Sequence, residues 1–412
     1  MAKILISSLG MGKKEDGGNY QKATYEIDEK TYETSFIADA LYQHFNIDKL
    51  FLVGTKKSIW DEAYSVFGGE DTEYQLELYE AKEEGGIDLE KLSDFEKILP
   101  NGSKNFIIDY GLNDGELWNN FEKFLKIADN IEDGDTLYLD ITHSFRSLSL
   151  MSFVMTQFAT TISDKKFKIG GVFYGMFEYS QENDGKTPII DLKLLLEIQE
   201  WIKAIEAIKV YSDFDPLVQL LENEEVNVEK DVNDTFIHLN NSLKMMNLAA
   251  LEKFIKHASK KIKPLLNSSN NIVKLLVPDI IKLVEELEKE EKSQFQFTLA
   301  NWFYKNKNYA FSYLALYEAI ISKSYELKND NVNDYKLREE AKRSLEKDEF
   351  GKYFCTKKGN SKYKDSKYKD SISNIRNSIA HQNNDRDTLV LEDINRLKKY
   401  LHKFKDYIEM EN

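Results

Sequence analysis

The sequence of 412 residues contains one cysteine, Cys355, and six histidines. A single cysteine excludes a disulfide framework and a cysteine-rich zinc site, and it fits a reducing compartment. Four of the histidines, His44, His238, His257 and His402, have no second ligand at metal-binding spacing, so we expect no bound metal. No apolar run approaches the roughly 20 residues that cross a bilayer, and the N-terminus lacks a signal peptide's apolar stretch. We therefore expect a cytoplasmic protein with no membrane partner.

Basic residues are scarce in the first part of the chain. The whole chain has a net charge of −15, residues 1–150 alone carry −15, and residues 301–412 carry +5. An acidic average argues against nucleic acid as a partner, because phosphate backbones attract basic surfaces. Read by segment, the charge leaves the last 112 residues open to such a partner. The length predicts two or three domains of ordinary globular composition.

Residues 1–190 show an α/β pattern. Apolar runs predict strands over Lys3–Ser8, Leu50–Gly54, Asn105–Asp109, Thr136–Ile141 and Lys168–Tyr174. Helices are expected over Phe36–Phe45, Leu117–Asn130 and Ser147–Thr161, and a small hairpin is expected over Tyr20–Ile27 and Lys30–Glu33. Strands that alternate with helices predict a mostly parallel, doubly wound sheet.

Residues 191–412 read as helical, with few glycines. Helices are expected over Leu192–Val210, Thr235–Leu266, Ile272–Lys289, Ser293–Lys305, Tyr309–Leu327, Tyr335–Glu346, Ser371–His381 and Leu391–Ile408. We place the domain boundary near residue 190. The repeated basic and aromatic segment Ser361–Asp370 is expected to be a loop, whose role as an RNA contact or as a solvated loop stays open.

The segment Asp140–Ser147 (DITHSFRS) lies where a predicted strand ends and a helix begins. In an open α/β sheet, ligands bind beyond the carboxyl ends of the strands, and a helix N-terminus favours phosphate. Thr142 and Ser144 add hydroxyls, His143 adds a hydrogen-bonding ring, and Arg146 adds a phosphate-binding guanidinium. The alternative is a simple helix cap by a hydroxyl. The combination favours a ligand site.

A second candidate, Ser7–Lys13 (SSLGMGK), follows the first strand. Small residues here let a ligand approach the backbone, although a plain glycine turn explains the pattern equally well. The segment is neither a Walker A loop nor G-x-G-x-x-G, so ATP hydrolysis is not expected. Its place beside the 140–147 segment in a parallel sheet favours a shared site.

A third candidate, Arg376–His381 (RNSIAH), lies on a late helix. Asn377 and His381 are four apart and share a face, whereas Arg376 lies about 140° from His381. A site that uses both needs the helix to end near His381, or a second copy to face it. Histidine can move a proton and arginine can hold a phosphate, but these residues could equally form an exposed polar face. Glu318 is a weaker candidate for support of this site.

These segments together resemble the CRISPR-associated CARF–HEPN ribonucleases, accessory effectors of type III CRISPR systems. The family's strand-end signature is matched by Asp140–Ser147, and its small-residue turn by Ser8–Gly10. Its late F-Y-G-like motif followed by Glu is matched by Phe173–Gly175 and Glu178. The R-x4–6-H motif of the HEPN domain is matched by Arg376-Asn377 and His381, and the order of the two parts also agrees.

The resemblance implies a Rossmann-like CARF sensor domain over 1–190, followed by an all-α region over 191–412 with a HEPN ribonuclease domain. Two CARF domains of a homodimer, or of a higher oligomer, would bind one cyclic oligoadenylate with four or six adenylates, and cyclic tetra-adenylate is the favoured activator. The residues expected to line that site are Ser8, Leu9, Gly10, Met11, Thr142, His143, Ser144, Phe145, Arg146 and Tyr174.

For the HEPN domain, the resemblance implies metal-independent endoribonuclease activity on single-stranded RNA, activated allosterically by the ring, in antiviral defence. The RNA's 2′-OH attacks and leaves a 2′,3′-cyclic phosphate and a 5′-hydroxyl. His381 would be the general acid or base, with Arg376 and Asn377 as the other catalytic residues. Two alternatives stay open: a non-catalytic nucleotide-sensing regulator, or a CARF domain that also opens its cyclic ligand.

Overall fold

A computed structural model describes residues 1–14, 19–143, 146–222, 229–326, 335–345, 351–354, 370–381 and 390–409. The chain forms two compact units, Met1–Glu197 and Ile198–Asn412. The boundary expected near residue 190 lies within the last strand of the first unit, β8 (Lys186–Asp191). None of the helices in the described part of the chain has both the length and the apolar character of a membrane span.

The first unit contains one eight-stranded sheet in the order β3-β2-β8-β7-β6-β1-β4-β5. All neighbouring pairs are parallel except β2–β3 and β7–β8, so the sheet is mostly parallel and Rossmann-like. The other strands are β1 (Lys3–Leu9), β2 (Ala23–Ile27), β3 (Lys30–Thr34), β4 (Lys49–Gly54), β5 (Lys104–Ile107), β6 (Thr136–Asp140) and β7 (Lys168–Gly175). The expected hairpin is confirmed as β2 and β3.

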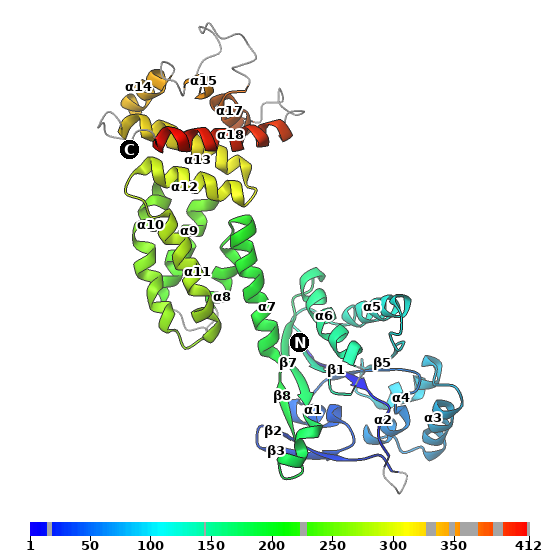
Figure 1. The fold of residues 1–412 in the computed structure, drawn as a ribbon. Coiled ribbons are helices and arrows are strands. Elements are labelled where there is room, and N and C mark those ends of the chain that lie inside the picture. The colour runs from blue at the N-terminus through cyan, green and yellow to red at the C-terminus, as the bar shows by residue number, and fades with distance from the viewer. Residues whose placement is uncertain are drawn as a thin grey trace. The chain divides into compact units, whose positions relative to one another are not determined.

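Alternate side chains of the central strands enter two separate cores. Leu50 and Leu52 of β4 pack on one face, whereas Phe51 and Val53 pack on the other, as the period of two in a strand requires. The first face is covered by α1 (Ile37–Phe45), α2 (Trp60–Val66), α3 (Thr72–Glu84) and α4 (Ser93–Ile98). The second is covered by α5 (Asp114–Ala128) and α6 (Arg146–Ile162) (Figure 1). Each of the four buried side chains of β4 named above stabilises the fold by about 1.5–3 kcal/mol.

The regular secondary structure described in the second unit consists of helices, which turns and loops connect (Figure 1). A π-helical turn, Ala207–Tyr211, continues α7. The helices are α7 (Lys193–Glu206), α8 (Asp215–Leu221), α9 (Lys230–Lys244), α10 (Leu248–Ile262), α11 (Asn271–Leu287), α12 (Lys292–Lys305), α13 (Tyr309–Glu326), α14 (Tyr335–Leu345), α15 (Gly351–Phe354), α17 (Ile372–His381) and α18 (Val390–Glu409).

The expectation of one helix over Thr235–Leu266 is wrong. The chain turns between α9 and α10, where Met246 has a left-handed φ of 51°. Asn247 then caps α10, because its side-chain oxygen accepts a hydrogen bond from Ala250 N at 3.1 Å. The apolar periodicity continues through the turn, so it did not mark the interruption.

Candidate functional site

A cavity of about 440 Å³ lies at the carboxyl ends of β1, β4, β6 and β7 in the first unit. These strands are parallel neighbours, so their C-terminal residues meet at one edge of the sheet. The predicted ligand residues that line the cavity are Ser8, Leu9, Gly10, Met11, Thr142, His143 and Tyr174. Ser144 and Phe145 lie outside the described residues, and Arg146 begins α6 with a side chain that also lies outside them.

Asp140 is fully buried at the end of β6 and organises the turn that follows it. Its carboxylate accepts hydrogen bonds from Ser7 Oγ and, at 2.8 Å, from Thr142 N. Thr142 Oγ1 in turn accepts from Gly175 N at 2.9 Å, which ties the end of β6 to the end of β7. Burial raises the pKa of the Asp140 carboxyl above its ordinary value, partly offset by His143 and by the hydrogen bonds that the carboxyl accepts.

His143 lines the cavity beside Tyr25 of β2, a residue that the sequence analysis did not select. The Tyr25 hydroxyl lies 3.0 Å from His143 Nε2, and Tyr25 is almost fully buried. Burial lowers the pKa of His143, although the nearby Asp140 opposes that shift. The lowered pKa favours a neutral ring, which contributes a hydrogen bond to a ligand rather than a positive charge.

Gly10 fits against the backbone of His143. A Cβ at Gly10 would lie 3.2 Å from the His143 carbonyl oxygen, so a side chain there would push on the strand-end turn. The Gly10 carbonyl accepts a hydrogen bond from Ile59 N at 3.1 Å, and Ser58 Oγ donates to the Leu9 carbonyl at 2.7 Å. The small-residue turn is thus fixed between the start of α2 and the 140–143 segment.

The chain beyond Gly10 also brings Lys13 and Tyr20 to the cavity lining. Tyr20 is anchored because its hydroxyl donates to Asp61 Oδ2 at 2.8 Å and accepts from Lys82 Nζ. Asp61 and Lys82 are both buried and form an ion pair at 3.4 Å. Lys13 brings a cation to a domain whose charge is strongly acidic. Its position next to the glycine turn was the only sequence signal.

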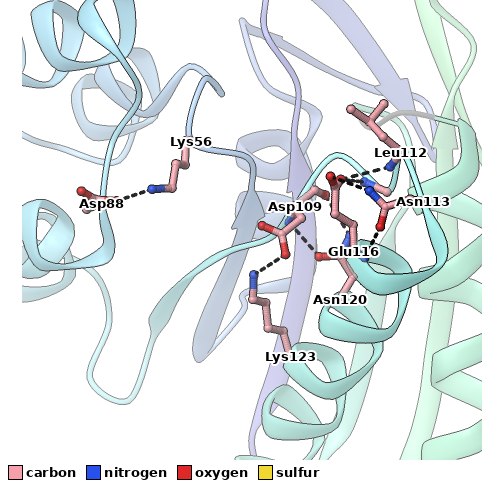
Figure 2. A network of polar contacts seen from close by, with 9 residues as sticks. Lys56, Asp88, Asp109, Leu112, Asn113, Glu116, Asn120 and Lys123 are labelled. Atoms are coloured by element: carbon pink, nitrogen blue, oxygen red, sulfur yellow. Dashed lines mark hydrogen bonds and ion pairs between the residues drawn. The ribbon is translucent and has the colours of Figure 1, made fainter.

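A separate network of polar contacts lies at the carboxyl end of β5 and the start of α5 (Figure 2). The carboxylate of Glu116 accepts hydrogen bonds from the backbone of Gly111 and Leu112, at 2.9 and 3.0 Å. Asp109 accepts from Lys123 at 3.1 Å, while Asn120 binds both backbone groups of Asp109. These polar groups bind one another, and none of the labelled residues lines the cavity.

The third predicted segment lies in the second unit, on α17. The Arg376 guanidinium stands over the ring of Tyr317 on α13, with its carbon 5.0 Å from the ring centre. Arg376 Nη1 donates to Asn377 Oδ1 at 3.1 Å. His381 is the last residue of α17, and its side chain lies outside the described residues. The loop predicted over Ser361–Asp370 also lies outside them, except for Asp370.

The comparisons with known proteins divide the chain in the same region as the fold. Residues 4–178 match the family model described as CRISPR system endoribonuclease Csx1, CARF domain. Residues 197–294 match the second domain of CRISPR-associated protein MJ1674. The chain is 33% identical over 410 residues to CRISPR-associated protein MJ1674 of Methanocaldococcus jannaschii, an alignment that covers 92% of this chain and 62% of the relative.

A solved structure, Enterococcus italicus Csm6 bound to cyclic hexa-2′-fluoro-hexa-dAMP, is similar at a TM-score of 0.38 and 14% identity. That similarity covers 97% of this chain and 93% of the solved chain. Residues 4–178 are thus similar to a CARF domain of the Csx1 type, and the second matched region and the curated relative both belong to a CRISPR-associated protein. The chain spans 62% of the length of that relative.

Proposed function

We propose that the chain is an endoribonuclease of CRISPR antiviral defence that a cyclic oligoadenylate activates. One observation carries the proposal. Within the region that matches the Csx1 CARF domain, two motifs whose residues Ser7 and Asp140 stand 133 positions apart meet at one cavity. Both motifs are among those by which the chain resembles the CARF–HEPN ribonucleases.

The chemistry of the cavity suits a phosphate-linked ring of adenylates. Lys13 supplies positive charge, and the start of α6 supplies the positive end of a helix dipole. Tyr174 and Tyr20 supply aromatic rings against which a base can stack. A homodimer would give a ring with an even number of adenylates two equivalent sites, and we favour cyclic tetra-adenylate over cyclic hexa-adenylate.

In the proposed reaction, the 2′-OH of one RNA nucleotide attacks the adjacent phosphorus and the P–O5′ bond breaks. The 2′-OH loses a proton and the departing 5′-oxygen gains one, so the products are a 2′,3′-cyclic phosphate and a 5′-hydroxyl. His381 is proposed to move one of these protons, while Arg376 and Asn377 hold the phosphate. No metal takes part, and ring binding raises activity through a coupling free energy between the two units.

The test is RNA cleavage with cyclic tetra-adenylate and cyclic hexa-adenylate side by side, each with and without EDTA. We expect one ring to activate cleavage that EDTA does not reduce. His381→Ala should abolish cleavage and leave ring binding unchanged. Ring binding without cleavage by the wild type would instead favour a non-catalytic regulator. Linear adenylates recovered from the His381→Ala protein would show that the first unit opens its ligand.

A further inference from the structure

Two consecutive residues of α13 hold two arginines from different helices. Tyr317 lies under the guanidinium of Arg376 from α17, and Glu318 binds the guanidinium of Arg338 from α14. Consecutive Cα atoms are only about 3.8 Å apart, so the two arginines are anchored at neighbouring positions of α13, on side chains that leave the helix about 100° apart. Tyr317 is also close enough to Arg338 to interact with it electrostatically.

The ring of Tyr317 holds the guanidinium of Arg376 in place. The ring of Tyr317 is buried, and its stack with Phe354 has centroids 5.2 Å apart and planes 17° from parallel. Among the described residues Arg376 forms no ion pair, and its Nε is buried without a hydrogen-bond partner. The aromatic contact therefore holds a guanidinium whose charge is not neutralised by a carboxylate of the described chain.

Arg338 is held by a carboxylate instead. Its Nη2 donates to both carboxylate oxygens of Glu318 at 2.6 Å, and its side chain is 26% exposed. A guanidinium has five N–H donors, and Glu318 engages those of one nitrogen. The pair thus orients Arg338 while the other edge of the guanidinium can still bind a phosphate.

We propose that Arg338 is a second phosphate-binding arginine of the ribonuclease site, and that Glu318 is its positioning residue. This inference rests on the proposed ribonuclease function. Arg338 binds a phosphate of the same RNA strand next to the one that Arg376 holds. Its substrate class is therefore the single-stranded RNA backbone, bound at two adjacent points and without regard to base sequence.

The experiment measures binding of a fluorescent single-stranded RNA with 2′-O-methyl riboses, which lacks the attacking hydroxyl, to the full chain across a range of salt concentrations. Loss of one phosphate contact should lower the slope of log K against log salt by about 0.7, which is about fivefold in affinity at 0.1 M salt. We expect this change for Arg338→Ala. Arg338→Lys, which keeps the ion pair and the positive charge, should recover most of the slope.

Arg396 provides the matched control. It is 24% exposed and pairs with Asp370, Glu392 and Asp393, so Arg396→Ala removes a similar ion-paired arginine whose ion-pair partners include neither Tyr317 nor Glu318. Its slope should equal that of the wild type. Glu318→Gln tests whether Glu318 positions Arg338 or acts only through its charge. If Glu318 positions Arg338, RNA binding should weaken, as we expect. If only net charge matters, the less acidic variant should bind RNA more tightly.

The outcomes distinguish the two proposals. If the wild type cleaves unmodified RNA but Arg338→Ala and Arg396→Ala have equal slopes, Arg338 is a structural ion pair and the inference is wrong. A wild type that neither binds nor cleaves RNA overturns the proposed function, and this inference with it. Thermal melting of each variant shows whether it is folded, and Arg338→Lys gives the answer if Arg338→Ala does not fold.

Discussion

The Tyr25 hydroxyl lies 3.0 Å from Nε2 of His143, and this hydrogen bond joins residues 118 positions apart. It connects the inserted β2–β3 hairpin to the turn that ends β6. With Nε2 engaged by Tyr25, Nδ1 is the ring nitrogen that can face a ligand. The hairpin, which lies at one edge of the sheet, therefore helps to orient a residue at the cavity.

Tyr25→Phe should weaken binding of the cyclic oligoadenylate without unfolding the first unit. The substitution removes the hydroxyl that hydrogen-bonds to His143, and a hydrogen bond contributes about 0.5–1.5 kcal/mol, so we expect roughly a two- to twelvefold rise in Kd. Isothermal titration with cyclic tetra-adenylate measures it. Tyr32→Phe is the matched control, because Tyr32 makes the same kind of bond to His44 Nδ1, at 3.1 Å, outside the cavity lining. Equal effects of the two substitutions would contradict the role of Tyr25.

The stability of the first unit should depend on the protonation of His143. Its pKa is lowered by burial, so below the ordinary value of about 6.5 the unfolded chain takes up a proton that the folded chain does not. Folding stability then falls as the pH drops below about 6.5. Burial raises the pKa of Asp140, whose contribution has the opposite sign and falls as pH rises above its ordinary range.

His143→Gln separates these two effects. We expect the melting temperature of the wild type, relative to this variant, to fall between pH 7.5 and pH 5.5. Hydrogen exchange of the β6 amides would locate the change in the first unit. A constant difference between the two proteins over this range would mean that His143 has an ordinary pKa.

Gly10→Ala should impair ring binding more than stability. Its Cβ would meet the His143 carbonyl at 3.2 Å, a contact tight enough to displace the turn by a few tenths of an ångström. Gly85→Ala is the control, because nothing lies within 4 Å of its Cβ and its φ of 177° lies outside the left-handed region. We expect Gly10→Ala to bind the cyclic oligoadenylate several-fold more weakly and Gly85→Ala to bind it as the wild type does. The melting temperatures of the two variants should differ little.

The sequence predicts the part of the cavity that local signals mark. A strand that ends in a polar turn before a helix was visible at Asp140–Ser147, and small residues were visible at Ser8–Gly10. The parallel arrangement follows from strands that alternate with helices, so the meeting of these two segments was predictable. The residues between Trp60 and Ile98, which form α2, α3 and α4, were not assigned.

Residues that act through long-range contacts could not be found in this way. Tyr25 sits in an ordinary strand pattern, and its importance depends on a partner 118 residues away. Lys82 looks like any solvated lysine of a charged helix, yet it is buried against Asp61 and Tyr20. Such pairs arise only when tertiary packing brings separate elements together, and a single sequence contains no periodicity that reports them.

The buried Asp61–Lys82 pair gives a test of the anchor beneath the cavity. Asp61→Asn leaves the buried Lys82 ammonium without its buried counter-charge, and the exposed Glu83 at 3.8 Å compensates only weakly, so the first unit should be destabilised by about 3 kcal/mol. The double variant Asp61→Asn, Lys82→Met removes both charges and should recover much of that loss. Thermal and urea unfolding measure the effect. If the double variant is no more stable than Asp61→Asn alone, charge burial is not the cause.

Tyr317 gives a test of the site on α17 that is independent of the arginine pair. Arg376 stands 5.0 Å above its ring, and the ring rather than the hydroxyl provides that contact. Tyr317→Phe should therefore keep RNA cleavage within roughly twofold of the wild type. Tyr317→Leu keeps an apolar side chain but removes the ring; a desolvated cation–π contact contributes up to about 2 kcal/mol, so kcat should fall by roughly tenfold or more.

The division between kcat and KM decides what Tyr317 does. A residue that positions Arg376 for the developing charge lowers kcat, with a smaller change in KM. A purely structural role for Tyr317 would reduce the amount of folded protein without changing kcat per active site. Single-turnover cleavage at saturating activator, normalised to folded protein, separates these cases. Equal kcat for Tyr317→Leu and the wild type would show that Arg376 needs no aromatic support.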